Sequence, residues 1–200
     1  MTGVTPIAEA VAAAREGGLI VFPTDTVYGI AARADRPAAT ARLFDAKSRP
    51  RDLTLPVLAA TVAEARRVAR FDARADRLAA ACWPGGLTLV LPRTPRSQDW
   101  DLGGDPASIG VRMPAHPLAL AVLAETGPLA TTSANRSGAS PATTCDELVA
   151  AFGTDVEVYL CQDEPLTAAA STVVSLLGPA LEVVRVGDLD PATIERLSAG

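Results

Sequence analysis

Lys47 is the only lysine in a chain whose lysine and arginine residues number 18 in total. It stands two residues before Arg49, in the segment Lys47-Ser48-Arg49-Pro50. An ammonium group acts as a movable point charge and a guanidinium group can bind two oxygen atoms at once, so the pair suits a phosphate-rich ligand. A coding bias towards arginine would leave the same pattern without a function, so further residues must support a site.

Hydroxyl, amide and basic side chains follow several of the strands that the sequence predicts. They are Thr24, Asp25, Thr26, Tyr28, Arg112, Thr131, Thr132, Ser133, Asn135, Ser171, Thr172 and Arg185. Ligands of open α/β sheets bind where strand ends bring such groups together. Any single member could simply serve a turn or a helix cap. Together with Lys47 and Arg49, the whole set predicts a ligand site.

Several common site chemistries find no support in the sequence. It contains neither G-x-x-x-x-G-K-[ST] nor G-x-G-x-x-G, which argues against a P-loop and a dinucleotide fold. The lone His116 precedes Pro117 at a predicted helix start, and we interpret it as structural rather than as a general base. The cysteines Cys82, Cys145 and Cys161 are widely spaced, which disfavours zinc and a disulfide framework and predicts reduced thiols.

The bulk composition predicts a globular, cytoplasmic protein. Hydrophobic residues make up 48% and charged residues 20% of the 200 positions, which suffices for a sizeable core. A net charge of −5 gives no overall basic field for nucleic acid, although it is compatible with a local basic cleft. Residues 1–6 lack the pattern of a signal peptide, and no apolar run reaches the ~18–20 residues of a membrane-spanning helix.

The elements that must position these residues alternate between helix and strand. Helices are predicted to begin near residues 6, 37, 62, 72, 117, 145 and 191, with strands over 19–22, 55–58, 87–91, 109–113, 129–132, 156–160, 172–176 and 181–184. The Thr61/Glu64 and Thr144/Glu147 spacings predict capping boxes. Crossover helices combined with adjacent late strands favour a mixed sheet. The polar segment 92–106 is the best candidate for a mobile flap.

The chain also carries a series of short motifs in a fixed order. They are P-T-D-T-V-Y-G at 23–29, K-S-R at 47–49, W-P-G-G-L-T-L-V-L-P at 83–92, G-V-R-M-P at 110–114, T-T-S-A-N-R-S-G at 131–138, S-T-V-V at 171–174 and R-V-G at 185–187. In this order they resemble the YrdC-like L-threonylcarbamoyladenylate synthase family over nearly the whole chain. The resemblance implies one YrdC-like domain over 1–200, a twisted mixed sheet of parallel and antiparallel strands with flanking helices and a concave basic ligand cleft.

The resemblance further implies a nucleotidyltransferase that uses L-threonine, bicarbonate or CO2, and ATP. The amine of threonine captures bicarbonate or CO2 as a carbamate, and a carbamate oxygen attacks the α-phosphorus of ATP and releases pyrophosphate. The product, threonylcarbamoyl-AMP, feeds the threonylcarbamoyl modification of an adenosine in tRNA, and other proteins perform that transfer. Mg²⁺ is expected on the triphosphate, held mainly by phosphates and water, with no metal bound by protein side chains. Weak contact with tRNA is compatible with this role, and no membrane is involved.

The resemblance assigns roles to residues by their positions in the motifs. Thr26, Arg112, Thr131 and Ser171 would hold threonine, with Arg112 on its carboxylate. Arg49, Ser108, Ser133, Asn135, Ser140 and Arg185 would hold ATP, and Lys47 and Arg49 would stabilise the reacting phosphates.

Two positions depart from the family pattern, and a third is less regular. Leu53 replaces an expected polar contact to ATP, and Leu58 stands where some relatives carry a histidine in the threonine site. The order of serine and proline also differs around Ser140. The chain ends at residue 200, which is short for the extra C-terminal domain of longer relatives and matches their single-domain form.

Other functions remain open at this point. One is a paralogue on the same scaffold that adenylates another carbamoyl substrate, or the carbamoyl-adenylating module of a hydrogenase-maturation protein. The intact K-x-R and S-x-N pairs argue against the paralogue, and the lack of acylphosphatase-like or zinc-finger segments argues against the maturation module. The other is an RNA-binding module, which the net charge and an aromatic content of 4% disfavour.

Overall fold

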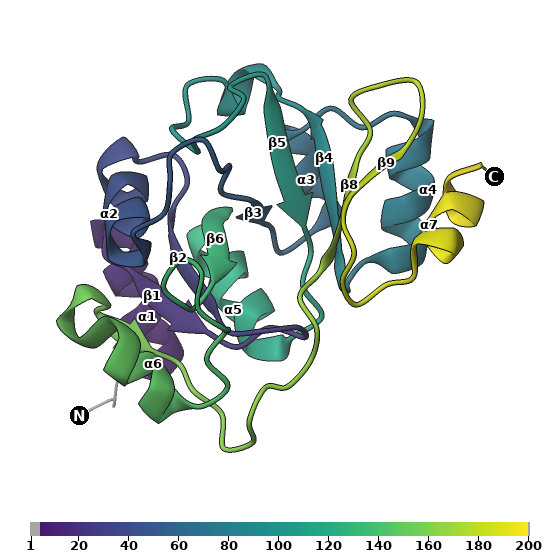
Figure 1. Ribbon diagram of the computed structural model, residues 1–200. Helices are drawn as coiled ribbons and strands as arrows, with labels where there is room; N and C mark the ends of the chain where they lie inside the picture. Colours follow the sequence, from purple (N-terminus) through teal and green to yellow (C-terminus); the bar gives the residue numbers. More distant parts are fainter. Residues whose placement is uncertain (1–4, 200) are drawn as a thin grey trace.

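Residues 5–199 are described by a computed structural model in which helices flank one sheet (Figure 1). The helices are α1 (Pro6–Glu16), α2 (Pro37–Lys47), α3 (Val62–Val68), α4 (Ala73–Cys82), α5 (Pro117–Thr126), α6 (Cys145–Phe152) and α7 (Pro191–Ala199). The strands are β1 (Ile20–Phe22), β2 (Gly29–Arg33), β3 (Val57–Leu58), β4 (Leu87–Pro92), β5 (Ser108–Arg112), β6 (Leu129–Ser133), β7 (Val158–Tyr159), β8 (Thr172–Ser175) and β9 (Glu182–Arg185). Residues 1–4, part of the segment tested for a signal peptide, lie outside the described residues.

The sheet mixes parallel and antiparallel pairs, which confirms the predicted fold class. Within residues 5–199 nine strands pair in the order β7-β1-β2-β6-β3-β5-β4-β8-β9. The pairs β1–β7, β3–β5 and β4–β8 are parallel, and the other neighbours are antiparallel. The sheet therefore places the start of β8 beside the start of β4 and the end of β5. No helix in the described residues is long and apolar enough to cross a membrane.

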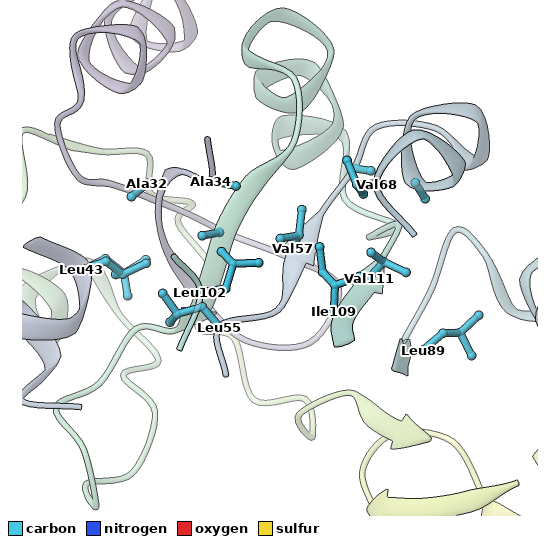
Figure 2. Packing of buried hydrophobic residues seen from close by; sticks show 14 of the residues in the cluster. Ala32, Ala34, Leu43, Leu55, Val57, Val68, Leu89, Leu102, Ile109 and Val111 are labelled. Carbon is cyan, nitrogen blue, oxygen red and sulfur yellow. The ribbon is translucent and has the colours of Figure 1, made fainter. Parts of the chain in front are cut away.

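Two apolar clusters bury the two faces of the sheet. The larger cluster includes Val57, Leu89, Ile109 and Val111 from central strands. In Figure 2, Val57, Ile109 and Val111 lie near one another, and Leu89 lies further to the right. The smaller cluster lies on the opposite face, where residues such as Leu58 pack with α1 and α5. Side chains alternate along a strand, so the residues of the two clusters show which strand positions face which side of the sheet.

Side-chain caps fix where several helices begin, as their sequences predicted. Thr5 accepts a hydrogen bond from the Ala8 backbone N–H at the start of α1. Asp72 caps α4 in the same way. At α6 both halves of the capping box form between Thr144 and Glu147, whereas at α3 only the Thr61 half forms. His116 caps α5, since its Nδ1 accepts from the Leu118 backbone N–H, which agrees with a structural role.

Strand β2 has no counterpart among the predicted strands. Its sequence, Gly-Ile-Ala-Ala-Arg, is poor in the β-branched and aromatic residues that favour strands. It forms because both of its edges are paired, with β1 on one side and β6 on the other. At Gly29 a side-chain carbon would lie only 2.8 Å from the Thr131 methyl group, so the close strand approach requires glycine there.

The expectation that all cysteines are reduced thiols is wrong. Cys145 and Cys161 form a disulfide that joins the start of α6 to the residues just after β7. Their spacing of 16 residues carried no recognisable pattern, and only the fold brings the two residues together. Cys82 is the free cysteine of the described residues, and burial raises the pKa of its thiol.

The segment 92–106 is held by buried contacts, contrary to the expectation of a mobile flap. The Arg93 guanidinium is buried and donates to the backbone carbonyls of Ser97, Trp100 and Ser108. Leu102 is fully buried in the larger cluster. The polar composition predicted a loop correctly. Its buried polar side chains, such as Arg93 and Ser97, bond to the protein, whereas others, such as Gln98, are exposed.

Candidate active site

The candidate residues gather on the face of the sheet opposite the larger cluster. Ile109 and Val111 face that cluster, so Ser108 and Arg112 of the same strand point to the other face. The same alternation and the strand register place Thr88, Thr131, Ser133, Ser171 and Arg185 on this second face. The strand alternation alone therefore collects residues from β4, β5, β6, β8 and β9 on one surface.

Arg112, at the end of β5, is a buried cation of the site. Its Nη1 donates to the Thr26 hydroxyl at 2.8 Å, and its Nη2 donates to Asp25 Oδ1 at 2.7 Å. Its Nε donates to the Gly85 carbonyl at 2.9 Å. Burial lowers the pKa of Arg112, while the charge of Asp25 opposes that shift. Thr26 and Arg112, which are both predicted to bind the threonine substrate, are therefore in direct contact.

Ser171 lies one residue before β8, and β8 is two strands away from the strand of Arg112 in the sheet. Its hydroxyl shares a hydrogen bond of 2.9 Å with the Thr88 hydroxyl, and both groups are buried. The Arg185 guanidinium donates to the Ser171 hydroxyl at 3.0 Å and to its carbonyl at 2.8 Å. Ser171 is predicted to bind threonine and Arg185 is predicted to bind ATP, so this hydrogen bond joins residues of the two predicted subsites.

Lys47 occupies the other end of the site, at the last position of α2. Its side chain is almost fully buried, and its Nζ donates to the carbonyls of Ser133 and Asn135, at 2.5 Å in each case. Burial, together with the charge of Arg49, lowers the pKa of Lys47 to about 8. The K-x-R and S-x-N motifs therefore meet through the lysine side chain.

The Arg49 side chain takes a different direction from that of Lys47, because Ser48, the residue between them, turns the chain. Ser48 adopts the left-handed conformation (φ 50°) that ends α2. The Arg49 guanidinium then donates to the carbonyls of Leu53 and Thr54, at 3.2 and 3.0 Å. The Leu53 side chain is 45% exposed. Because it is a hydrocarbon, it offers no polar contact at this position.

The positive charges of the site act on one another. The pKa of Arg49 is lowered by burial and then by the charge of Arg185, and Arg185 also lowers the pKa of Arg112. Lys47 is in turn affected by Arg49. The four cations therefore form a connected row from the Lys47 end to the Arg112 end, although the concave shape of the predicted cleft stays a prediction.

Three predicted residues stand apart from these contacts. Ser108 begins β5 and lies roughly 13 Å along the strand from Arg112, on the same face, which suits the far end of a long ligand. Thr131 is buried in β6, and its hydroxyl donates to the carbonyl of Leu129. Ser140 is exposed in the segment between β6 and α6.

Asn135 organises that segment. Its Nδ2 donates to the carbonyls of Arg136 and Ala139, at 2.9 and 2.7 Å. Among the described residues, its Oδ1 is the buried side-chain polar atom that lacks a hydrogen-bond partner. The site thus keeps one unused acceptor close to Lys47.

The roles assigned from the resemblance omit two residues whose contacts the structure reveals. Asp25 pairs with Arg112, and Thr88 holds the Ser171 hydroxyl. Asp25 was visible as the neighbour of Thr26 in the motif at 23–29. Thr88 could not be found from the sequence, because an alternating strand gives no sign of which face carries the ligand.

Mg²⁺ that arrives with a nucleotide stays a prediction for this site. Residues 5–199 contain no group of three or more histidine, cysteine, aspartate or glutamate side chains placed to hold a metal. Phosphates and water would then hold the ion, and the neighbouring cations would attract the phosphates.

A mixed α/β sheet with one lysine, three arginines and several hydroxyl groups near its strand ends is typical of an enzyme domain that binds anionic ligands. Comparison with known proteins then specifies the family. Residues 12–187 match the Sua5/YciO/YrdC family model, which is described as telomere recombination. The chain belongs to this family.

Individual relatives match most of the chain. A protein of Mycobacterium tuberculosis, provisionally named a threonylcarbamoyl-AMP synthase, is 40% identical over 96% of this chain and 87% of its own. The threonylcarbamoyl-AMP synthase of Pyrococcus abyssi is 36% identical over 92% of this chain and 54% of its own. The crystal structure of P. abyssi Sua5 complexed with L-threonine superposes with a TM-score of 0.87 at 35% identity, over 96% of this chain and 56% of that longer one.

Proposed function

We propose that this chain is a threonylcarbamoyl-AMP synthase. The reaction joins L-threonine, bicarbonate and ATP into threonylcarbamoyl-AMP, pyrophosphate and water, with CO2 able to replace bicarbonate. The observation that carries the proposal is the row of Lys47, Arg49, Arg185 and Arg112, each held in place by hydrogen bonds to the protein. Relatives named for this activity, at 36 to 40% identity over most of the chain, support it and do not favour the paralogue or the RNA-binding module.

The two ends of the row suit the two substrates. At one end, Arg112 uses one N–H of each terminal nitrogen within the protein, so one N–H on each can bind the threonine carboxylate. Thr26, Ser171 and Thr131 lie on the same part of the sheet and contribute to this subsite. At the other end, Lys47 and Arg49 offer positive charge to phosphates.

The nucleotide extends across the face between these ends. Arg49 and Arg185 bind phosphate oxygens, while Ser108, Ser133, Asn135 and Ser140 contact the remaining parts of ATP. A magnesium ion bound to the phosphates would lower their negative charge. The downstream proteins that transfer the threonylcarbamoyl group to tRNA would receive the product.

The chemistry requires orientation and charge stabilisation rather than a protein nucleophile. The carbamate is already anionic, so it can attack the α-phosphorus once the two are held in line. Negative charge then grows on the phosphate oxygens and on the leaving pyrophosphate. Lys47 and Arg49 stabilise that charge, because both are held in place before the reaction begins.

A matched pair of arginine variants tests this proposal. We expect Arg49→Ala to lower threonine-dependent pyrophosphate release by roughly 10²–10³-fold, the usual effect of losing a transition-state donor. Arg51 is the control, because it lies two residues away but pairs with Asp101 and covers the Phe44 ring. Arg51→Ala should retain most of the activity. Pyrophosphate release that does not depend on threonine in the wild type would contradict the proposal.

A further inference from the structure

The two oxygens of the Asp25 carboxylate have different surroundings. Oδ1 accepts from Arg112 Nη2 at 2.7 Å and from the Ala115 backbone N–H at 2.9 Å. Oδ2 has no hydrogen-bond partner within residues 5–199, and the Asp25 side chain is 19% exposed against 6% for Arg112. One oxygen is therefore fixed against the protein, and the other stays available at the more open side of the pair.

The geometry points to Asp25 as the residue that binds the α-amino group of the threonine substrate, while Arg112 binds the α-carboxylate. This inference rests on the proposed function. An α-amino acid carries its nitrogen and its carboxylate on one carbon atom. A site that binds both groups therefore needs an anion directly beside a cation. The hydrogen-bonded pair of Asp25 and Arg112 supplies that arrangement, with an unused acceptor on one partner and unused donors on the other.

The contact would persist through the first chemical step. The neutral amine forms a bond to the carbon of CO2, or to that of bicarbonate, in which case a C–O bond breaks and water leaves. The resulting carbamate nitrogen keeps one N–H. That N–H can still donate to Asp25 Oδ2, so the nitrogen stays in place while a carbamate oxygen turns towards ATP. The protons released in carbamate formation pass to solvent, and Asp25 remains a carboxylate throughout.

A competing explanation assigns Asp25 only the task of holding Arg112. The two roles differ in which ligands they affect. A positioning role acts on every carboxylate that Arg112 binds, whereas an amine contact acts only on ligands that carry the amine. Comparing threonine with its deamino analogue, (R)-3-hydroxybutyrate, separates them because the analogue keeps the carboxylate and the hydroxyl.

The experiment measures the affinity of both ligands by calorimetry for the wild type, Asp25→Asn and Asp188→Asn. The asparagine keeps an oxygen that can accept from Arg112 and Ala115 but removes the negative charge. Asp188 is the matched control, since its charge also acts on Arg112 without a hydrogen bond to it. Asp25→Glu provides a second variant that keeps the charge, and a thermal melt checks folding of each.

We expect Asp25→Asn to weaken threonine binding by about tenfold to a hundredfold, the scale of a charge-assisted hydrogen bond. The affinity for (R)-3-hydroxybutyrate should stay the same or rise, and Asp188→Asn should leave the ratio of the two affinities unchanged. Equal weakening of both ligands, or no weakening of either, would overturn the inference. A wild type that prefers another amino acid would contradict the threonine assignment alone, and the comparison would then use that amino acid and its deamino analogue. A wild type that binds no amino acid would overturn both proposals.

Discussion

Three of the four cations at the site are held by backbone carbonyl groups. Lys47 donates to two carbonyls, Arg49 to two others, and Arg185 to the carbonyl of Ser171. Among the ion pairs of residues 5–199, none includes these three side chains. Carbonyl dipoles orient a cation without cancelling its charge, so this part of the site stays positive and ready for phosphate.

Arg112 follows the opposite principle, because Asp25 neutralises its charge. A buried arginine without a partner would be strongly destabilising. The ligand proposed for it is an amino acid with no net charge at neutral pH, which needs a balanced pair rather than excess positive charge. The distribution of acids therefore supports the proposed division into an amino-acid end and a phosphate end.

Lys47 gives a direct test of the electrostatics at the phosphate end. As the only lysine in the chain, it gives a single ε-carbon signal when the protein is labelled with ¹³C-lysine. We expect this signal to titrate with a pKa of about 8 in the free protein, because burial and Arg49 disfavour the charged form. Bound ATP should raise that pKa, since phosphate favours the ammonium ion. A value near 10.4, as in an exposed lysine, would show that the side chain is not buried.

The same shift has a consequence for stability. The folded protein releases the Lys47 proton near pH 8, whereas the unfolded chain keeps it until about pH 10.4. Between these values the unfolded state binds more protons, so this group makes the folded state more stable as pH rises. Below pH 8 the full cost of burying the charge is present. Burial of the charged Lys47 side chain therefore destabilises the folded protein, and a bound phosphate would offset that effect.

At the scale of elements, the disulfide connects the site to the edge of the sheet. Cys145 is the first residue of α6, directly after the segment that carries Asn135 and Ser140, and Cys161 follows β7. The bond therefore closes a loop that contains α6 and limits how far the segment before it can move. Its loss should affect stability and the ATP end of the site together.

Thiol counting and unfolding of a double variant test this connection. Alkylation of the unreduced, denatured protein should modify Cys82 alone, and reduction should expose all three cysteines. The variant Cys145→Ser/Cys161→Ser should lose about 3 kcal/mol in the free energy of unfolding, as for a closed loop of similar length. Urea denaturation measures the difference, with Cys82→Ser as the control. Three reactive thiols in the unreduced protein would contradict the bond.

The sequence predicted elements well where a local cause determines them. The helix starts near residues 6 and 72 and the capping box at Thr144 depend on residues close in sequence, and the structure confirms them. Strand β2 was missed because its pairing depends on β1 and β6, and the Cys145–Cys161 bond was missed because the fold brings its partners together. Contacts between distant parts of the chain were therefore the main source of error.

At the scale of the whole molecule, strand register converts separate motifs into one site. Gly29 pairs with Ser133, which places the start of β2 at the same end of the sheet as the end of β6. The residues between β1 and β2 then reach from this end to Arg112 at the other, through Asp25 and Thr26. One short connection thus links the phosphate end to the amino-acid end. The motifs revealed which residues belong to the site, but only the register shows their order along it.

This separation predicts how the two substrates stabilise the folded protein. A ligand that binds only the folded state at 100 times its Kd adds about 2.7 kcal/mol to the free energy of unfolding, which is roughly 5–11 °C in Tm for a chain of this size. We expect Mg²⁺-ATP and L-threonine each to raise Tm in a thermal melt. Arg49→Ala should remove most of the ATP effect and keep the threonine effect, because Arg49 lies at the phosphate end.

The reverse pattern should hold for Arg112→Gln, which removes the carboxylate-binding guanidinium at the amino-acid end. Transfer RNA serves as the control polyanion: with a net charge of −5, the protein should bind it weakly, and about 0.2 M salt should abolish any rise in Tm that it causes. A loss of both substrate effects in either variant, after folding is verified, would mean that the two ends form a single subsite. Retention of both effects in Arg49→Ala would place the nucleotide elsewhere on the molecule.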